Sequence, residues 1–211
     1  MDIFGEKWNR HAEKLSDSFS ILNDDDVCVI CGDLSWGMNL EQCREDFKLI
    51  DSFPGRKIIL KGNHDYWWST ASKALRFFQE NGIESIEILN NNSFLYQNTA
   101  ICGTRGWFYE EDSGTQHDRK IMLREIGRLK TSLESAESDN IIVFLHYPPL
   151  YGNYCCEEIL ELLRTYRVEL CCYGHLHGKS CFGAFTGKLG CTQYKLVSAD
   201  HLDFSPLRLL D

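Results

Sequence analysis

Four short apolar runs punctuate the chain, and a polar residue follows each of them. The runs cover residues 27–31, 57–60, 141–145 and 170–173, and Lys57 is the only charged side chain within them. Continuous apolar runs of this length are typical of strands in a sheet that is covered on both faces. The pattern therefore predicts an α/β protein.

Segments with helical spacing of apolar residues lie between the apolar runs. Phe4, Trp8 and Leu15 belong to one such amphipathic segment. Asn39 is an expected N-cap, and Gly82 follows a helix as a C-terminal signal. Helices are predicted over residues 2–20, 39–51, 71–81, 118–136 and 157–166.

Shorter β-like runs occupy much of the remaining sequence, at residues 86–89, 94–96, 100–102, 181–185 and 194–197. Residues 90–92, all asparagine, supply a hairpin turn, and residues 187–190 supply a second turn. These small strands predict a second sheet facing the first.

Potential metal ligands follow all four apolar runs, where α/β proteins commonly place their chemistry. They are Asp33, Asn63, His146, His175 and His177. Asp and His suit Mn, Fe, Zn or Mg, and Asn63 adds a neutral oxygen. Next to Asn63, His64 can carry a proton near neutral pH, and Asp65 offers a carboxylate to orient it. A polar turn would explain any one of these junctions, but four of them favour a metal site.

The order Gly-Asp, Gly-Asn-His-Asp, single His, Gly-His-x-His resembles the signature of the calcineurin-like metallophosphoesterases, from about Val27 to the C-terminus. The resemblance implies a single domain over residues 1–211, with the fold of a four-layer α-β-β-α sandwich of two mixed sheets flanked by helices. It also implies two divalent transition metal ions. The implied roles are Asp33 as the bridge, Asn63, His146 and His175 on one metal, His177 on the other, and His64 facing the phosphate with Asp65 behind it.

The chain departs from the family pattern at its beginning. The family's first strand ends in Asp-x-His, and both of those residues bind the metal that His177 also binds. No Asp-x-His precedes Gly32 in this chain. We therefore expect that the first strand is missing, that the chain begins just after it at an internal methionine, and that one metal is held in place of two. Asp2 and His11 are the nearest substitutes, in the wrong order and context.

Arg105 and an aromatic cluster lie beside these motifs, and each has two interpretations. Arg105, in Gly-Thr-Arg-Gly-Trp, is a candidate to bind a substrate phosphate through two hydrogen bonds, or a member of a structural ion pair. The cluster Tyr66-Trp67-Trp68 is either core or a substrate platform. The polar residues 109–117 suggest a surface loop that could serve as a lid.

Composition narrows the classes of function. The chain has 211 residues, 43% of them hydrophobic, and a formal net charge of −9. This length suffices for a sizeable core, and the acidic balance argues against non-specific binding to nucleic acid or to anionic membranes. We find no signal peptide and no run of about 18 apolar residues. Several of the ten cysteines lie in apolar runs, which favours reduced core thiols and a cytoplasmic protein.

Two functions remain open from the sequence. One is a metal-dependent phosphoesterase that hydrolyses mono- or diesters of a small molecule or a phosphoprotein with metal-activated water. The other is a weakened or non-catalytic relative that keeps the fold and binds one metal. A cysteine-rich zinc module is disfavoured because the cysteines are not paired at knuckle spacing along the chain. Cys28-x-x-Cys31, a possible redox or zinc half-site, lies inside an apolar run rather than at a helix N-terminus or on a zinc knuckle, which favours a core role.

Overall fold

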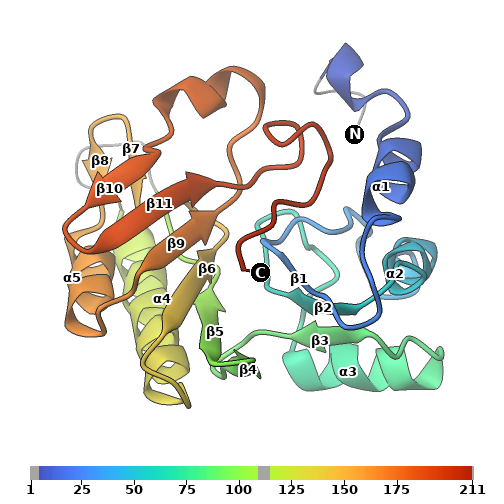
Figure 1. The fold of residues 1–211 in the computed structure, drawn as a ribbon, viewed down its shortest axis with the longest axis horizontal. Coiled ribbons are helices and arrows are strands. Elements are labelled where there is room, and N and C mark those ends of the chain that lie inside the picture. The colour runs from blue at the N-terminus through green and yellow to red at the C-terminus, as the bar shows by residue number, and fades with distance from the viewer. Residues whose placement is uncertain (1–4, 109–114, 211) are drawn as a thin grey trace.

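Two β-sheets form the interior of the protein, and helices cover the outer face of each (Figure 1). The computed structural model describes residues 5–108 and 115–210. The first sheet is wholly parallel, in the order β1 (Val27–Ile30), β2 (Arg56–Ile59), β3 (Ile86–Ile88). The second sheet has the order β10-β11-β9-β6-β5-β4, with parallel strands inside and an antiparallel strand at each edge. Its strands are β4 (Phe94–Tyr96), β5 (Thr99–Thr104), β6 (Ile141–Leu145), β9 (Leu170–Tyr173), β10 (Gly187–Leu189) and β11 (Thr192–Leu196).

The helices end close to where the sequence signals place them, but the second begins at Arg44 rather than next to Asn39, whose side chain accepts from the Gln42 N–H in the preceding turn and caps no helix. They are α1 (His11–Phe19), α2 (Arg44–Asp51), α3 (Ala71–Glu80), α4 (Gln116–Glu134) and α5 (Glu157–Thr165). The Thr70 side chain caps α3 by accepting from the Lys73 N–H, and Thr115 forms a capping box with Asp118 on α4. The predicted helix over residues 2–20 is interrupted, because Arg10 adopts a left-handed conformation with φ 57° between a short 3-10 turn (Glu6–Trp8) and α1.

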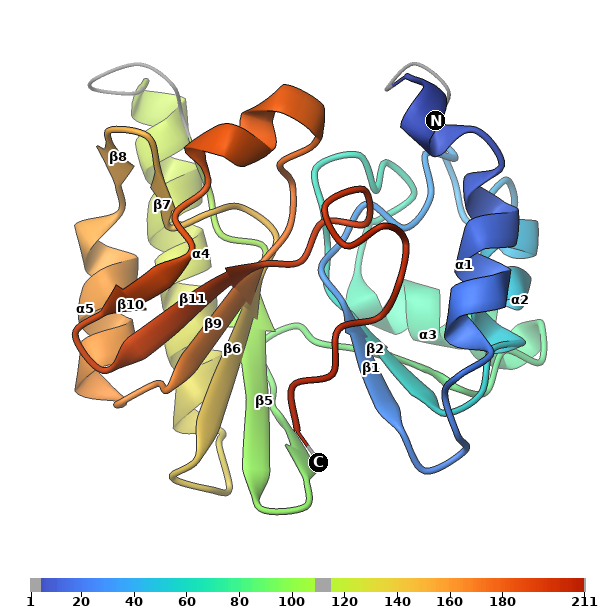
Figure 2. The same ribbon diagram turned by 45° about the horizontal axis from the view of Figure 1, so that its top comes forward.

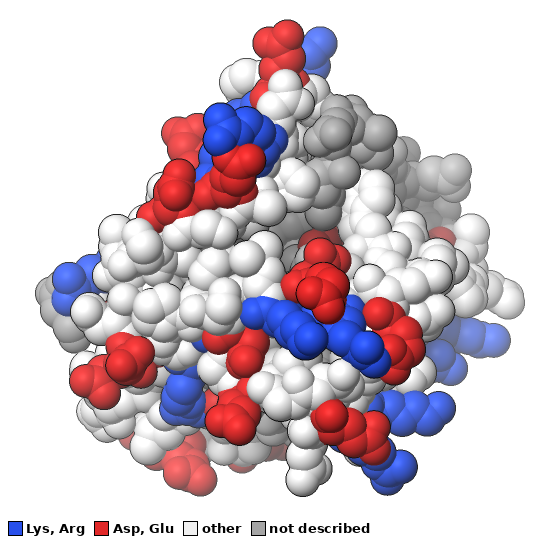
Figure 3. All heavy atoms as spheres, turned by 90° about the vertical axis from the view of Figure 1, so that its right-hand side faces the viewer, with Lys and Arg blue, Asp and Glu red and all other residues white. Residues whose placement is uncertain are grey.

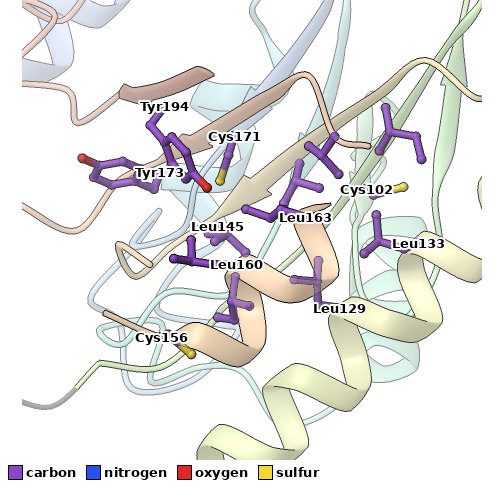
Figure 4. Packing of buried hydrophobic residues seen from close by; sticks show 14 of the residues in the cluster. Cys102, Leu129, Leu133, Leu145, Cys156, Leu160, Leu163, Cys171, Tyr173 and Tyr194 are labelled. Carbon is purple, nitrogen blue, oxygen red and sulfur yellow. The ribbon is translucent and has the colours of Figure 1, made fainter. Parts of the chain in front are cut away.

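Three apolar clusters separate four layers, which confirms the predicted sandwich. One cluster packs the second sheet against α4 and α5 through Leu129, Leu145 and Leu163 (Figure 4). Another packs the first sheet against α2 and α3 through Phe47 and Phe78, with Phe19 of α1. The third lies between the sheets, and its members are Cys31, Ile58, Leu60, Leu89, Ile101, Ile142, Phe144 and Cys172.

Two of the predicted small strands are placed differently from expectation. Residues 86–88 join the first sheet rather than the second, because α3 carries the chain across from β2 and returns it parallel to that strand. Residues 181–185 were expected to form a strand. The structure has a 3-10 helix over Gly178–Gly183 instead, in a segment with glycine at both ends. Residues 187–189, expected as a turn, form β10.

A large cavity opens beside β1, which pairs with β2 on one side and is an edge strand among the described residues. The cavity has a volume of about 1120 Å³ and is lined by β1, by the inner face of the second sheet and by the C-terminal segment. That segment runs between the two sheets (Figure 2). The polar end of the same cavity includes Asp33, His146 and His175, so the cavity leads to the predicted metal site.

Acidic and basic side chains alternate on the face that carries α1 and α2 (Figure 3). Several are paired there, as in Arg44–Glu41, Arg10–Glu13 and Lys7–Asp203. This face offers no continuous basic surface for a nucleic-acid backbone. Within the described ranges, no helix has both the length and the apolar character needed to cross a membrane.

Three of the four cysteines in the apolar runs are buried in the core, as predicted, and Cys28 is partly buried against the cluster of the first sheet. Cys31, Cys171 and Cys172 are buried, and burial raises the pKa of Cys28 to about 12. A thiol whose pKa is raised in this way is a poor nucleophile near neutral pH. The interpretation of Cys28-x-x-Cys31 as core is thereby supported.

Candidate metal centre

The carboxyl ends of four parallel strands bring Asp33, Asn63, His146 and His175 together. Asp33 follows β1, Asn63 follows β2, His146 follows β6 and His175 follows β9. One ligand atom from each of Asp33, His146 and His175 lies within 4.8 Å of the others. Four of the five metal ligands that the family resemblance implied therefore meet at one place.

Asn63 lies at the centre of this group. Its Oδ1 is 2.6 Å from His146 Nε2 and 2.9 Å from His175 Nδ1, and these two nitrogens are 3.2 Å apart. His146 Nε2 is also 3.6 Å from Asp33 Oδ2. Ligands about 2.1 Å from a shared metal lie roughly 3 Å from one another, so the donor spacing suits a single transition metal ion.

The tautomer of His146 provides a test of whether a cation fits this site. Its Nδ1 is 2.7 Å from the Cys31 carbonyl oxygen, which can only accept, so Nδ1 carries the proton and donates. Nε2 is then a lone-pair acceptor that faces the Asn63 oxygen, which is also an acceptor, at 2.6 Å. Two acceptors at this distance repel each other; a cation bound to both would relieve the repulsion, as would an Asn63 amide turned so that its Nδ2 donates to Nε2. The donor set therefore fits a bound metal.

The backbone at this centre is tightly constrained. Asp33 and His175 adopt left-handed conformations, with φ values of 57° and 68°, which cost roughly 1–2 kcal/mol each for residues with a side chain. Gly62 permits the β1 and β2 loops to meet, since a Cβ atom there would lie 2.0 Å from Asp33 Oδ1. Strained conformations of this kind concentrate at functional sites.

Burial determines the charge states of the ligands in the absence of metal. It lowers the pKa of His146 to about 3 and the pKa of His175 to about 4, so both imidazoles are neutral near pH 7. Burial raises the pKa of Asp33, and the hydrogen bond from the His64 N–H opposes that shift. Neutral imidazoles are the form in which histidine binds a metal.

Asp65 does not lie behind His64, in contrast to our expectation. Its Oδ2 accepts from the N–H groups of Gly62 (2.7 Å) and Asp33 (2.9 Å). Its Oδ1 accepts from the N–H groups of Leu34 and Ser35 and from the indole of Trp67. A carboxylate filled by five donors has little capacity left for an imidazole. Asp65 therefore joins the two loops that carry Asp33 and Asn63.

His64 is oriented by aromatic neighbours instead. Its Nδ1 lies 2.8 Å from the Tyr66 hydroxyl, and its ring stacks on Trp36 with centroids 4.6 Å apart. Its backbone N–H donates to Asp33 Oδ1 at 2.8 Å, which ties it to the ligand group. Of the predicted aromatic cluster, Trp67 is core and 4% exposed, whereas Tyr66 lies beside His64.

His177 is not among the ligand atoms that lie within 4.8 Å of one another, but it is near enough for its charge to act on Asp33, His146 and His175. Its Nδ1 is 2.7 Å from Asp200 Oδ1, and its ring meets Trp8 edge-on with centroids 5.2 Å apart. Burial alone would raise the pKa of Asp200, but hydrogen bonds from His177 and the Gly178 N–H lower it below its usual value. The sequence analysis did not identify Asp200 as part of this region. Of the proposed substitutes, His11 has its Nδ1 3.1 Å from the Trp8 carbonyl, and Asp2 falls outside the described residues.

Arg105 forms an ion pair with a buried glutamate, Glu125. Its guanidinium lies 3.4 Å from Glu125, which is 2% exposed and also accepts from Thr104, and it packs over Trp107. The Arg105 carbonyl accepts from the N–H groups of His146 and Tyr147, so its loop adjoins the centre. Most of the lid expected over residues 109–117 falls outside the described part of the chain.

Comparison with known proteins adds independent findings. A family model described as "Calcineurin-like phosphoesterase" matches residues 4–179. The crystal structure of TT1561 of Thermus thermophilus is similar, with 13% identity and a TM-score of 0.51, covering 89% of this chain and 83% of that one. This likeness concerns the fold alone.

Two further solved structures are more distant. The protein of unknown function AQ665 from Aquifex aeolicus has 16% identity and a TM-score of 0.46, covering 93% of this chain and 80% of that one. Another structure has 12% identity and a TM-score of 0.45 over 73% of this chain, which spans 62% of that structure's length. A search of curated proteins finds no match.

Proposed function

The chain belongs to the calcineurin-like phosphoesterase family, and we propose that it is a hydrolase that cleaves phosphomonoester or phosphodiester bonds with metal-activated water. The convergence of Asp33, Asn63, His146 and His175 carries this proposal. A carboxylate, an amide oxygen and two neutral imidazole nitrogens meet there as potential metal ligands. Such a site binds a divalent transition metal.

Each residue of the centre has a distinct task in this proposal. Asp33, Asn63, His146 and His175 hold the ion, for which Mn, Fe and Zn are the candidates. When bound, a divalent metal polarises the phosphoryl oxygens and activates water for attack on phosphorus. His64 faces the substrate oxygen, and Asp65 keeps the loops of Asp33 and Asn63 at their separation. His177 is the chain's candidate ligand for a second ion, as in a dinuclear centre.

Metal analysis and turnover test the proposal together. We expect the purified chain, loaded with manganese, to retain close to one ion and to hydrolyse a chromogenic phosphodiester. His146→Ala and His175→Ala should each lose the ion, whereas His64→Ala should keep it and lose turnover. His201→Ala is a matched control because His201 is exposed. Full metal content in His146→Ala would contradict the ligand assignment.

A second candidate function is a non-catalytic or weakened protein with one metal. The observation that favours it is that, in the described part of the chain, only Asp33, His146 and His175 form a group of His, Cys, Asp or Glu ligands of metal-binding spacing, while His177 is held by Asp200. One tightly bound ion without hydrolysis of mono- or diesters would support this function. Two tightly bound ions would exclude it and would imply a substitute for the missing Asp-x-His.

The substrate class and the cellular setting are further parts of this proposal. We propose a small phosphate ester or a phosphoprotein as substrate, in the cytoplasm, without membrane or non-specific nucleic-acid binding. The net charge of −9 supports the last point. Turnover compared between nitrophenyl esters and a phosphopeptide would separate the two substrate classes.

A further inference from the structure

The cavity beside β1 follows the edge of that strand. Every residue from Asp26 to Gly37, which includes all of β1, is among the residues that line it. Successive side chains of a strand point to opposite faces of the sheet, so a cavity over one face alone would be lined by alternate residues. The cavity therefore runs along the edge of β1, on the side where the described residues provide no neighbouring strand.

The open side of β1 presents backbone groups of Val27 and Val29. The Ile30 carbonyl accepts from the Leu60 N–H, so Ile30 faces β2. Successive residues of a strand turn their N–H and C=O groups to opposite sides, so the two valines face away from β2. The next residue in this alternation, Cys31, accordingly turns its carbonyl towards the second sheet. No strand among the described residues pairs with the valines there, and a row of donors and acceptors is left for an added strand.

Apolar side chains line the cavity on both sides of this edge. Ile101, Ile142 and Phe144 belong to the inner face of the second sheet. Leu15 and Phe19 line the cavity from α1. A strand added to β1 would place its alternate side chains against these two walls. An extended run of apolar residues fits such a groove, whereas an alkyl chain would leave the backbone groups of β1 unpaired.

The metal centre lies at one end of the same edge. Asp33 follows β1 and lines the cavity together with His146 and His175. β1 has four residues, which span about 13 Å. An added strand of similar length therefore brings the residue at its end to the ligands. The C-terminal segment, residues 206–210, borders the cavity without pairing with β1 (Figure 2).

We propose that the edge of β1 binds an extended apolar segment of a phosphoprotein as an added strand and so directs the phosphorylated side chain at the metal centre. This inference rests on the proposed function and selects the phosphoprotein as its substrate class. Pairing of main-chain groups supplies affinity for the extended segment, and the two apolar walls select its side chains.

Amide hydrogen exchange of residues 27–31 tests this binding without any need for turnover. The probe is the peptide Lys-Lys-Val-Ile-Val-Ile followed by a non-hydrolysable phosphonate analogue of phosphoserine; a second probe carries the analogue before the apolar run. In the zinc-loaded protein, we expect the amides of Val27 and Val29 to exchange rapidly and to be slowed roughly tenfold or more by one of the two probes. Probes that are N-methylated throughout the run cannot complete the pairing and should give no protection.

A substitution at the edge tests the same pairing from the side of the protein. Val29→Pro removes an outward N–H and leaves the pairing with β2 in place, since proline is tolerated at strand edges. Val29→Ala keeps the N–H and is the matched control. Val29→Pro should raise KM for the phosphoserine peptide about tenfold and leave KM for nitrophenyl phosphate unchanged, whereas Val29→Ala should change neither by more than about twofold. The N-methylated probes test the pairing even if Val29→Pro does not fold.

Several outcomes would overturn the proposal. They are slow exchange of Val27 and Val29 in the protein without peptide, no protection by either probe, or equal protection by the unphosphorylated peptide. A dimer in light scattering that protects β1 by itself would assign the edge to a second copy of the chain. Dodecyl phosphate with a KM as low as that of the peptide would assign the cavity to an amphiphile. Protection of β1 by a probe, without hydrolysis of any ester, would instead overturn the proposed function, so the two failures are distinguishable.

Discussion

Replacing Asp65 by Asn removes the connection between the loops that carry the metal ligands. The native carboxylate accepts five hydrogen bonds, three at Oδ1 and two at Oδ2. Asn keeps one acceptor oxygen and presents an NH₂ group at the other position. In either orientation, at least two N–H donors lose their partner and face another donor.

The magnitude follows from the kind of bond that is lost. Hydrogen bonds to a charged acceptor contribute about 1.5–3 kcal/mol each, so the loss of two amounts to roughly 3–6 kcal/mol. Burial raises the pKa of Asp65, while the N–H groups of Gly62, Asp33 and Ser35 oppose that shift, so replacing the charge by a neutral amide recovers part of this cost. For a chain of this length, 1 kcal/mol shifts Tm by about 2–4 °C, and we expect Asp65→Asn to lower Tm by about 10 °C.

Metal affinity should fall with stability. The two donors at Oδ2 belong to Asp33 itself and to Gly62, the neighbour of Asn63, so both ligand loops lose their anchor. Substitutions that release metal ligands in this way typically reduce affinity about 10- to 100-fold. Thermal unfolding by circular dichroism and titration calorimetry with zinc measure the two effects.

Asp139→Asn, at an exposed position, is the control and should change neither Tm nor zinc affinity. The reasoning would be refuted by an Asp65→Asn variant with unchanged Tm and metal affinity that loses only turnover. That outcome would restore Asp65 as the residue that orients His64.

Three further outcomes are expected. In the metal-free protein, stability should fall as pH drops from about 6.5 towards 5, because unfolded His146 and His175 take up protons that the folded forms, with pKa values of about 3 and 4, do not. The free energy of unfolding, measured with urea, should change by up to roughly 1.4 kcal/mol per pH unit for each histidine, and a flat profile would contradict this. Lys57→Met should lower the free energy of unfolding, measured with urea, by about 2–4 kcal/mol, because the buried ammonium donates to the carbonyls of Asp51, Phe53 and Gly55. Lys48→Met, at an exposed position, is the control and should leave the free energy of unfolding almost unchanged. Arg105→Met should lower Tm by destabilising buried Glu125, and a raised KM with unchanged Tm would support the phosphate-binding interpretation instead.

Strand ends can be predicted from the sequence because their signal is local. A continuous apolar run followed by Gly and a polar residue marks a buried parallel strand, and parallel strands place their carboxyl ends at one edge. This reasoning, together with the family resemblance, places Asp33, Asn63, His146 and His175 at one site from the sequence alone. The four-layer packing follows from the same alternation of buried strands and amphipathic helices.

Partners within a loop cannot be predicted in the same way. Asp65 follows His64 directly in sequence, which favours contact between them, yet its carboxylate faces the opposite side and binds N–H groups about thirty residues away. The direction in which a loop carboxylate points depends on how many hydrogen-bond donors lie on each side of the loop. Here the carboxylate accepts from five N–H groups that would otherwise lack a partner, and these five hydrogen bonds contribute more free energy than one hydrogen bond to the imidazole.

The contacts of His177 show how segments that are distant in sequence orient a candidate metal-binding histidine. Asp200 comes from the segment after β11 and Trp8 from the turn before α1, and no sequence pattern connects either of them with His177. Asp200 also accepts from the Gly178 N–H, so it fixes both the imidazole and the backbone beside it. A histidine oriented through Nδ1 by a carboxylate has its Nε2 side directed elsewhere, an arrangement common among metal ligands. The Asp200–His177 pair is therefore compatible with either function, and metal stoichiometry decides between them.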